Sequence, residues 1–386
     1  MTTASALVLV GAGRLEAREI PVPDPAPGEA VLAVEACGLC GTDHELYSGV
    51  LATRLPLVPG HEIVGTIGEA TPQFLEARGL AQGDRVAVEV FQRCVRCEAC
   101  SAGNYPLCRY HGLGDSYGNR PLEEGSGLWG GYATHLVLTP DSMVHRVPDH
   151  LDPLTATLFN PYGAGIRWGV TLGGIGPGTT VAVLGPGLRG LGVVAAAVGA
   201  RAGYVMLTGA GPADADRLAT GKAFGAHRTV DVHAEDPRRM LKQDTGGLAD
   251  VVVDVTANAP EAFVQAIDLA RPGGTIVVAG TRGHHTLQGW NPDRLVGKEL
   301  RVLGALGVDG AAYRAALDFL GDNPVLGQVS RRVVGLDPDE VGGLLHQMAH
   351  GPDRPLHGVV AARPIGDPGR SQGGQRHGNG HGMSTA

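Results

Sequence analysis

Aromatic residues are scarce in this sequence: phenylalanine, tryptophan and tyrosine together make up 4% of the 386 residues. Proteins that stack bases or sugars need a platform of aromatic rings, and this scarcity argues against one. Positive charge is also limited, because 31 lysines and arginines stand against 39 aspartates and glutamates, a formal net charge of −8. Since this surplus of negative charge repels a phosphate polyanion, nucleic-acid binding is not expected.

Long hydrophobic runs are missing as well. No segment reaches the ~18 uncharged apolar residues of a membrane-spanning helix, and Arg189 and Arg201 bracket the longest candidate. The first ten residues, MTTASALVLV, carry no basic residue ahead of their apolar run, so they predict a strand rather than a signal peptide. We therefore expect a cytoplasmic protein that acts on a small-molecule substrate, with no membrane partner.

The order of apolar runs indicates two domains, as the chain length also suggests. Up to residue 152, short runs such as EAVLAVEACG and GDRVAVEV are separated by proline and glycine, which is typical of a β-rich domain. Over 153–321, nearly continuous apolar strands alternate with helices, which predicts a parallel sheet covered by helices on both faces. Residues 364–386 are polar and glycine-rich, and predict a disordered tail.

A glycine-rich loop follows the apolar strand TVAVLG and opens a helix of small residues. Its glycines, Gly185, Gly187 and Gly190, have the spacing G-x-G-x-x-G. The first permits a tight turn, the second lets the backbone approach a pyrophosphate, and the third allows close packing of helix on strand. Together with Leu188 and Arg189 they predict a dinucleotide site, because a helix N-terminus attracts phosphate charge.

Four of the six cysteines lie within fifteen residues, and this group is the most specific metal signal in the chain. They are Cys94, Cys97, Cys100 and Cys108. In a reducing compartment such a group indicates a metal rather than disulfides. Four thiolates can surround a tetrahedral Zn²⁺ with no open position, as in a structural site. An iron–sulfur cluster is the alternative, but the wide final spacing and the absence of a following proline argue against it.

The stretch GLCGTDHELYSGVLATRLPLVPGHE, from Gly38 to Glu62, holds ligand types for a second metal. Cys40 provides a thiolate, His61 an imidazole, and Thr42 a hydroxyl two residues after the cysteine. A Zn²⁺ that polarises an alcohol or carbonyl oxygen needs two or three such ligands and one open position. A hydroxyl beside that position would carry the substrate proton away.

The phrase CGTD followed by PGHEIVGTI resembles the zinc-dependent medium-chain alcohol dehydrogenase family. The resemblance covers about residues 7–363, nearly the whole chain apart from its tail. It implies a GroES-like β-rich catalytic domain over 1–152, completed by about 322–363, with a doubly wound Rossmann domain over 153–321 between the two pieces. The family is usually dimeric or tetrameric, so the resemblance implies a homodimer or homotetramer.

The resemblance also implies one catalytic zinc on Cys40 and His61, one structural zinc on the four-cysteine group, and NAD or NADP as cofactor. The third catalytic ligand of the family, a cysteine, aspartate or glutamate, is replaced here by Asn160. A neutral amide is a poor zinc ligand. Either Asn160 binds weakly or through water, or Glu62 takes the vacant place, and we favour Glu62.

Thr42 matches the family's hydroxyl that accepts the alcohol proton. The position of the family's relay histidine holds Glu45, and an imidazole stands one residue earlier at His44. The relay therefore runs through His44, through Glu45, or straight to solvent.

The acid that normally holds the ribose 2′-hydroxyl of NAD is also missing, because its family position is Gly209. Its absence removes the repulsion of a 2′-phosphate, and Arg217 lies a few residues along. Asp214 or Asp216 could instead reach back to a ribose. We lean to NADP and leave NAD open.

The resulting hypothesis is an NAD(P)-linked, zinc-dependent oxidoreductase that interconverts an alcohol, polyol or sugar hydroxyl and the corresponding carbonyl by hydride transfer. Two alternatives stay open. One is a zinc-free, NADPH-dependent enone or quinone reductase of the same superfold, which the missing third ligand favours. The other is a nucleotide-binding protein that has lost turnover.

Overall fold

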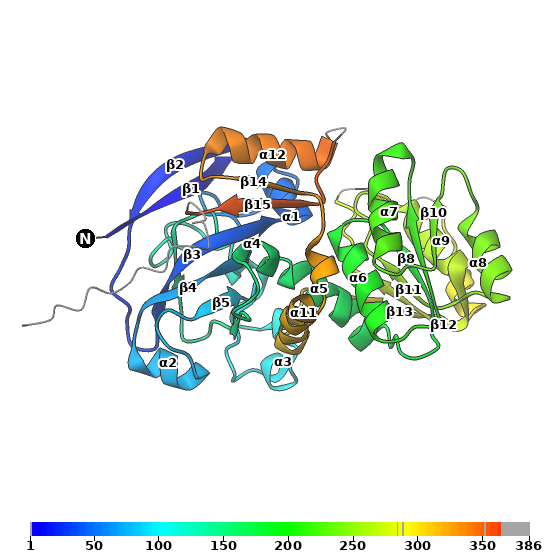
Figure 1. Cartoon of the computed structure of the whole chain (residues 1–386), viewed down its shortest axis with the longest axis horizontal. Coiled ribbons are helices and arrows are strands. Elements are labelled where there is room, and N and C mark those ends of the chain that lie inside the picture. Colours follow the sequence, from blue (N-terminus) through cyan, green and yellow to red (C-terminus); the bar gives the residue numbers. More distant parts are fainter. Residues whose placement is uncertain (1, 284, 288, 351–352, 364–386) are drawn as a thin grey trace, which may run out of the picture.

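The computed structural model describes residues 2–283, 285–287, 289–350 and 353–363. Two domains lie side by side, one rich in strands and one in which helices flank a sheet (Figure 1). Helices α5 (Phe159–Gly165) and α11 (Gly310–Asp322) lie between them. The α/β fold that the sequence predicts, with a β-rich domain and a parallel-sheet Rossmann domain, is confirmed.

The β-rich domain is organised around two long antiparallel strands, β3 (Ala30–Leu39) and β4 (Glu62–Ala70), whose apolar side chains are almost all buried. A hairpin of β1 (Thr3–Gly11) and β2 (Arg14–Pro21) packs against the same core. The other strands of the central sheet come from distant parts of the chain. They are β5 (Arg85–Val88), β6 (His135–Leu138), β7 (Val144–Arg146), β14 (Arg331–Val334) and β15 (His357–Ala361).

The C-terminal segment returns to this sheet after the Rossmann domain. β15 pairs antiparallel with β3, with Gly358 opposite Leu39, and β14 lies parallel to β15. Helix α12 (Pro338–His350) connects the two strands and packs its buried leucines into the core of the β-rich domain. One sheet is thus assembled from two pieces that are separated by the whole second domain (Figure 1).

The Rossmann domain contains a parallel sheet with the strand order β10-β9-β8-β11-β12-β13. Its strands are β8 (Thr180–Leu184), β9 (Tyr204–Gly209), β10 (Arg228–Asp231), β11 (Ala249–Asp254), β12 (Ala270–Val278) and β13 (Arg301–Gly304). Its main helices are α6 (Leu188–Gly199), α7 (Ala215–Ala223), α8 (Pro237–Thr245) and α9 (Glu261–Leu269). The central strands are apolar and buried because helices cover both faces, whereas every residue of β13 is exposed.

The remaining helical segments lie mostly in connections. They are α1 (Gly41–Tyr47), α2 (Pro72–Arg78), α3 (Glu98–Ser101), α4 (Pro153–Ala156), α10 (Asp293–Val296), the short 3-10 helices η1 (Tyr105–Leu107), η2 (Leu113–Asp115), η4 (Pro212–Asp214) and η5 (Pro324–Gly327), and the π-helix η3 (Ile166–Leu172). None of the helices in the described ranges is long and apolar enough to cross a bilayer.

Helix α5 ties the two domains together. All of its residues are buried, and a Cβ on Gly165 would lie 2.2 Å from the carbonyl carbon of Gly192 in α6. Any larger side chain would push the two helices apart, so glycine is required for this close approach. The contact fixes Asn160, near the start of α5, at the boundary between the domains.

Candidate metal and cofactor site

The register of β3 and β4 brings the predicted catalytic ligands together. Cys40 follows the end of β3, and His61 and Glu62 stand at the start of β4, where Gly38 pairs with Glu62. Cys40 also precedes α1, and its backbone N–H donates to Asp43 Oδ2 at 2.8 Å. A strand end, a helix start and a neighbouring strand therefore meet at one point.

The three side chains form a compact, buried group. The Cys40 sulfur lies 3.1 Å from Nε2 of His61, and one potential ligand atom from each of Cys40, His61 and Glu62 lies within 4.8 Å of the others. On the far side of the imidazole, His61 Nδ1 lies 3.7 Å from Asp43 Oδ1. A thiolate, an imidazole and a carboxylate are a ligand set that zinc accepts.

Unsatisfied polar atoms support a metal at this position. Oε2 of Glu62, Nδ1 of His61 and Oδ1 of Asp43 are buried without a hydrogen-bond partner among the described residues. A buried polar atom without a partner costs on the order of 1–3 kcal/mol, so folded proteins rarely keep several together. A cation held by Glu62 and His61 would satisfy the carboxylate oxygen directly, and it would polarise the imidazole toward Asp43.

Burial dominates the electrostatics of the group. It raises the pKa of the Cys40 thiol to about 11, with the nearby Asp43 carboxylate adding to the effect. It also raises the pKa of Glu62 to about 8, and the negative charge of Cys40 acts in the same direction. The Cys40 thiolate and the Glu62 carboxylate are both unfavourable here without a positive charge beside them. The site therefore suits a divalent metal, which binds the deprotonated thiol and carboxyl groups.

Asn160 lies close to this group but is engaged elsewhere. Its side chain is buried, and Nδ2 donates to the hydroxyl of Tyr313 at 3.3 Å. The amide lines the same cavity as His61, but its oxygen is neutral and a poor zinc ligand, whereas a carboxylate oxygen of Glu62 lies within 4.8 Å of the ligand atoms of Cys40 and His61. This arrangement favours Glu62 over Asn160 as the third ligand.

A cavity of about 250 Å³ opens between the domains above the ligand group. The β-rich domain contributes Thr42, Glu45 and Phe91, and the Rossmann side contributes Trp168 and Arg189. Its other lining residues include Asn119, Val255, Thr281, Leu306 and Tyr313. Mostly apolar walls with a few convergent polar groups are typical of a small-molecule site.

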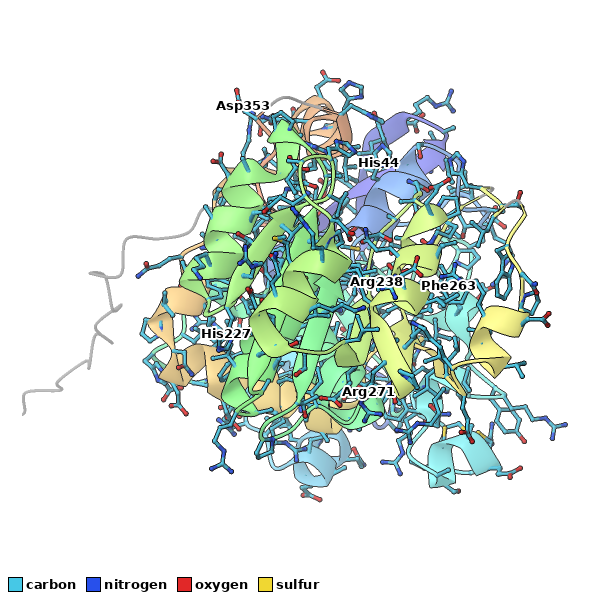
Figure 2. The ribbon with its side chains drawn as sticks, turned by 90° about the vertical axis from the view of Figure 1, so that its right-hand side faces the viewer. His44, His227, Arg238, Phe263, Arg271 and Asp353 are labelled. Atoms are coloured by element: carbon cyan, nitrogen blue, oxygen red, sulfur yellow. The ribbon has the colours of Figure 1, made fainter. Side chains whose placement is uncertain are left out.

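The two relay candidates separate in the structure. Glu45 lines the cavity, and its Oε1 accepts a hydrogen bond from Thr281 Oγ1 at 3.2 Å, across the domain boundary. The ring of His44, labelled on α1 in Figure 2, instead lies 5.2 Å from the ring of His350 on α12, centre to centre. The structure therefore brings Thr42 and Glu45 to the cavity and leaves His44 outside it.

The glycine-rich loop has the geometry that a phosphate needs. Gly185 has φ +102°, in the region that favours glycine, and a Cβ on Gly190 would lie 1.9 Å from the carbonyl oxygen of Gly185. Gly187 caps α6, and no atom lies within 4 Å of where its Cβ would be. The backbone N–H groups of Leu188 and Arg189 begin the helix at this open point, as a phosphate site requires.

Arg189 differs from the rest of the loop. Its side chain lines the cavity, and Nη2 lies 3.6 Å from Glu62 Oε1. The sequence assigned Arg189 to the cofactor alone, and its approach to Glu62 was not foreseen. Tyr313 was also missed, because it comes from α11 and no motif surrounds it. Burial raises the pKa of Tyr313 well above that of an ordinary tyrosine, so it is a hydroxyl rather than an anion.

The second cofactor region lies at the end of β9, at Gly209. Asp214 stands directly beside it and accepts the Ala210 N–H at 2.9 Å through Oδ2. Arg217 Nη1 lies 3.8 Å from Asp214 Oδ1, and burial together with the charge of Arg354 lowers the pKa of Arg217. Asp216 is exposed and lines a surface hollow with Arg217 and Arg354. The structure thus places Asp214 beside Gly209, Arg217 beside Asp214, and Arg354 in the same surface hollow as Arg217.

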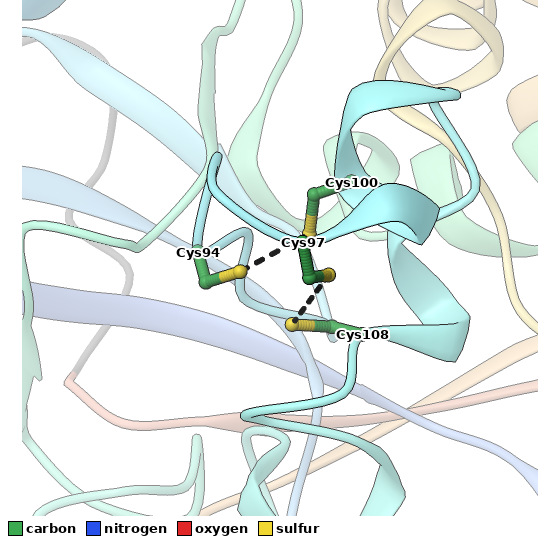
Figure 3. Close-up of side chains that lie close together, drawn as sticks. All are labelled: Cys94, Cys97, Cys100 and Cys108. Carbon is green, nitrogen blue, oxygen red and sulfur yellow. Dashed lines mark hydrogen bonds between the residues drawn. The ribbon is translucent and has the colours of Figure 1, made fainter.

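The four-cysteine group is compact (Figure 3), and none of its cysteines lines the cavity. Sγ of Cys94 lies 3.7 Å from that of Cys100, and Sγ of Cys97 lies 3.9 Å from that of Cys108. All four sulfurs lie within 4.8 Å of one another, and none forms a disulfide. The backbone N–H groups of Arg109 and Cys100 lower the pKa of Cys97, which favours a thiolate. These distances suit four ligands around one metal ion.

Comparison with known proteins places this arrangement in context. Residues 26–149 match the family model described as alcohol dehydrogenase GroES-like domain, and residues 190–322 match zinc-binding dehydrogenase. A relative from Mycobacterium tuberculosis, named "Probable alcohol dehydrogenase adh", is 57% identical over 360 residues, which cover 92% of this chain and 97% of the relative. Erythritol/L-threitol dehydrogenase of Mycolicibacterium smegmatis is 32% identical, with 76% of this chain and 79% of that protein covered.

Solved structures share the fold. A zinc-binding dehydrogenase from Sinorhizobium meliloti, bound to NADP, is 29% identical with a TM-score of 0.79, and the match covers 94% of this chain and all of the other. An alcohol dehydrogenase from Thermotoga maritima superposes with a TM-score of 0.82 at 23% identity, covering 94% and 100% of the two chains.

Proposed function

This chain belongs to the zinc-dependent medium-chain alcohol dehydrogenase family, and we propose that it oxidises a small alcohol, polyol or sugar, or reduces the corresponding carbonyl, at a metal held by Cys40, His61 and Glu62. The observation that carries the proposal is the buried ligand group, with its unsatisfied oxygen and nitrogen atoms, beneath a cavity lined by both domains. The relative named for erythritol and L-threitol, which are polyols, supports the substrate class.

Zinc at this site would act as a Lewis acid toward the substrate oxygen, and a bound nicotinamide would accept or donate the hydride. The residues of the chain have other tasks. Asp43 orients the imidazole of His61 from behind, and the apolar walls around Phe91 and Trp168 exclude water from the substrate carbon. The glycine-rich loop binds the pyrophosphate through backbone N–H groups.

The proton route begins at Thr42 and continues through Glu45. Thr42 lines the cavity and offers a hydroxyl that can accept the substrate proton while passing on its own. Glu45 lies one helical turn along α1 and is hydrogen-bonded to Thr281, which holds its carboxylate at the cavity wall. His44 faces α12 and is therefore not part of the proposed route.

We propose NADP as the preferred cofactor. Arg217 and Arg354 approach each other from different domains, and Asp214 is the counter-charge that lies 3.8 Å from Arg217. Two neighbouring cations are stabilised when an anion binds between them, and a 2′-phosphate is such an anion. Asp353, next to Arg354, lies beside the Rossmann domain in Figure 2. The structural relative that binds NADP supports the same choice.

The exposed edge strand β13 supports a homodimer. Val302, Leu303 and Leu306 are 38%, 36% and 43% exposed, and Val296 on the preceding helix is 79% exposed. An unpaired strand edge with apolar side chains is a template for pairing with another strand. Antiparallel pairing of β13 with its copy would bury these residues, and Leu303→Arg is then expected to convert a dimer into a monomer in sedimentation analysis.

The proposed function is tested by zinc stoichiometry combined with a turnover screen. Metal analysis of the purified protein should give about two zinc ions per subunit, and NADP⁺ should be reduced in the presence of one class among simple alcohols, polyols and sugars. One zinc ion per subunit, together with reduction of enones, would identify a reductase that has the structural zinc but no catalytic zinc. Tight cofactor binding without turnover on any of these classes would indicate a protein that has lost its activity.

A further inference from the structure

Arg189 connects two sites that the sequence treats as separate. Its backbone lies in the glycine-rich loop, in the first turn of α6. Its guanidinium lies 3.6 Å from the carboxylate of Glu62 and lines the cavity near the Cys40 sulfur. Trp168 borders the same space, with its ring centre 5.9 Å from the Arg189 Cζ. A single side chain therefore spans from the phosphate loop to the proposed metal ligands.

Glu62 has two possible counter-charges. Its side chain is 1% exposed, Oε1 faces Arg189, and Oε2 has no hydrogen-bond partner in the described part of the chain. A carboxylate this deeply buried needs a cation beside it, either the guanidinium or a divalent metal ion. Both cations at the carboxylate at once would repel each other in a buried, weakly screened setting. The two partners of Glu62 are thus alternatives.

We propose that Arg189 competes with the catalytic metal for Glu62, and that a bound dinucleotide ends this competition by drawing Arg189 onto its phosphates. The inference rests on the proposed function, because it requires both a metal at Cys40, His61 and Glu62 and a pyrophosphate at the start of α6. An arginine fork binds a phosphate through paired, charge-assisted hydrogen bonds. Since the backbone of Arg189 belongs to the phosphate loop, its side chain needs only a change of rotamer to reach that ligand.

The consequence is coupling between cofactor and metal. Without a dinucleotide, Arg189 occupies Glu62 and weakens metal binding; with a dinucleotide, Glu62 is free to act as a ligand. Linkage requires that the metal strengthen cofactor binding by the same factor, and couplings of this kind are typically about 5- to 150-fold. The enzyme would hold its catalytic metal most firmly when it is ready for turnover.

The test measures the zinc affinity of the catalytic site by equilibrium competition with a chromogenic chelator, using the intact enzyme loaded with both metals. In the wild type, saturating NADPH should tighten zinc binding about tenfold. Arg189→Met keeps the length of the side chain without its charge. This variant should bind zinc about tenfold more tightly than the wild type in the absence of NADPH, and NADPH should then change its zinc affinity less than twofold.

Two controls keep the test specific. The four-cysteine group serves as an internal reference, since its zinc should be retained equally by both proteins. Arg217→Met removes another cation of the cofactor region, and it should weaken NADPH binding without changing the zinc affinity of the cofactor-free enzyme.

A second variant, Arg189→Lys, retains the charge and should keep part of the coupling between NADPH and zinc, which provides a second measurement if the methionine variant folds poorly.

Other outcomes would overturn the inference. If Arg189→Met leaves the cofactor-free zinc affinity unchanged or lowers it, Arg189 does not compete for Glu62. If NADPH still tightens zinc binding tenfold in that variant, another group carries the coupling. A wild-type enzyme with a single zinc ion per subunit would instead refute the proposed function itself, and metal analysis distinguishes this case before any variant is made.

Discussion

The two groups of candidate metal ligands are built in opposite ways. Cys94, Cys97, Cys100 and Cys108 come from one short segment of the chain, and their sulfurs lie within 4.8 Å of one another. Cys40 and His61 come from the ends of two paired strands, and the cavity above them is closed by residues of the other domain. A group formed within one loop has its geometry determined by local spacing, whereas a group at a domain boundary depends on how the whole protein packs.

This difference also separates their chemistry. Four sulfurs around one point leave no open position, so a metal there can only hold the lobe together. The Cys40 group provides three ligand atoms, and it faces a cavity where a substrate oxygen can complete the coordination. We therefore expect substitutions in the four-cysteine group to lower the stability of the protein. Substitutions in the Cys40 group should instead abolish turnover in a protein that still folds.

The strongest test of this contrast compares Cys40→Ala with Cys100→Ala. Cys40→Ala should lower kcat by more than about 10³-fold and lose one zinc ion per subunit, and it should still bind NADPH, about tenfold more weakly than the zinc-loaded wild type. Cys100→Ala should lose the other zinc ion and reduce the free energy of unfolding by on the order of 3 kcal/mol, because metal binding contributes to folding. Steady-state kinetics, metal analysis and thermal unfolding distinguish the two. Full turnover by Cys40→Ala would end the assignment of a catalytic metal to this cysteine.

The next comparison asks which residue completes the catalytic ligand set. Glu62→Gln should weaken zinc binding at the catalytic site about 100-fold, since an amide is a poorer ligand than a carboxylate. Asn160→Ala should change it less than tenfold, because the neutral amide oxygen of Asn160 is a poor zinc ligand. Chelator competition measures both. A larger loss of zinc affinity in Asn160→Ala than in Glu62→Gln would identify Asn160 as the third ligand.

A smaller effect is expected at the far end of the cofactor region. Gly209→Asp should lower the ratio of kcat/KM for NADP⁺ to that for NAD⁺ about tenfold, because a carboxylate there repels the 2′-phosphate. A Cβ on Gly209 would lie 3.0 Å from Cβ of Asp214, so crowding must be separated from charge. Gly209→Ala is the matched control and should leave the ratio within about twofold of the wild type. An unchanged ratio in the aspartate variant would show that Gly209 has no part in cofactor choice.

The last comparison concerns the proton route, where the expected effects are about tenfold or less. Glu45→Gln should lower kcat about tenfold at neutral pH, since the relay loses its carboxylate. His44→Asn should change kcat less than twofold, because the imidazole faces His350 rather than the cavity. Measuring kcat for both variants with one alcohol substrate settles the choice. A larger loss of kcat in His44→Asn than in Glu45→Gln would show that His44, and not Glu45, relays the proton.

Features that depend on neighbouring residues could be predicted from the sequence. The parallel Rossmann domain followed from nearly continuous apolar strands alternating with helices, and the membership of the alcohol dehydrogenase family followed from the CGTD and PGHE phrases; both are confirmed. The loop glycines were identified from their spacing, and the structure gives Gly185 a positive φ and leaves no space for a Cβ on Gly190. Their roles toward a bound cofactor stay predictions.

Features that depend on distant residues could not be predicted. The sequence left His44 and Glu45 equivalent, and only the packing of α1 against α12 turns one of them away from the cavity. Tyr313 and Arg354 have no motif around them, and they matter because α11 and the C-terminal segment bring them next to Asn160 and Arg217. Asp214 likewise comes to stand beside Gly209 through the loop that follows β9.

The sequence by itself determined the family, the fold class and which residue types can hold zinc and phosphate, because those properties depend on local spacing and on the period of apolar residues. Only the tertiary structure decided how these residues face one another: Glu62 against Arg189, Glu45 against Thr281, and Asn160 against Tyr313. The physical reason is that the cavity lies between two domains. Its contacts join residues up to hundreds of positions apart, and no local pattern encodes which side chains will meet there.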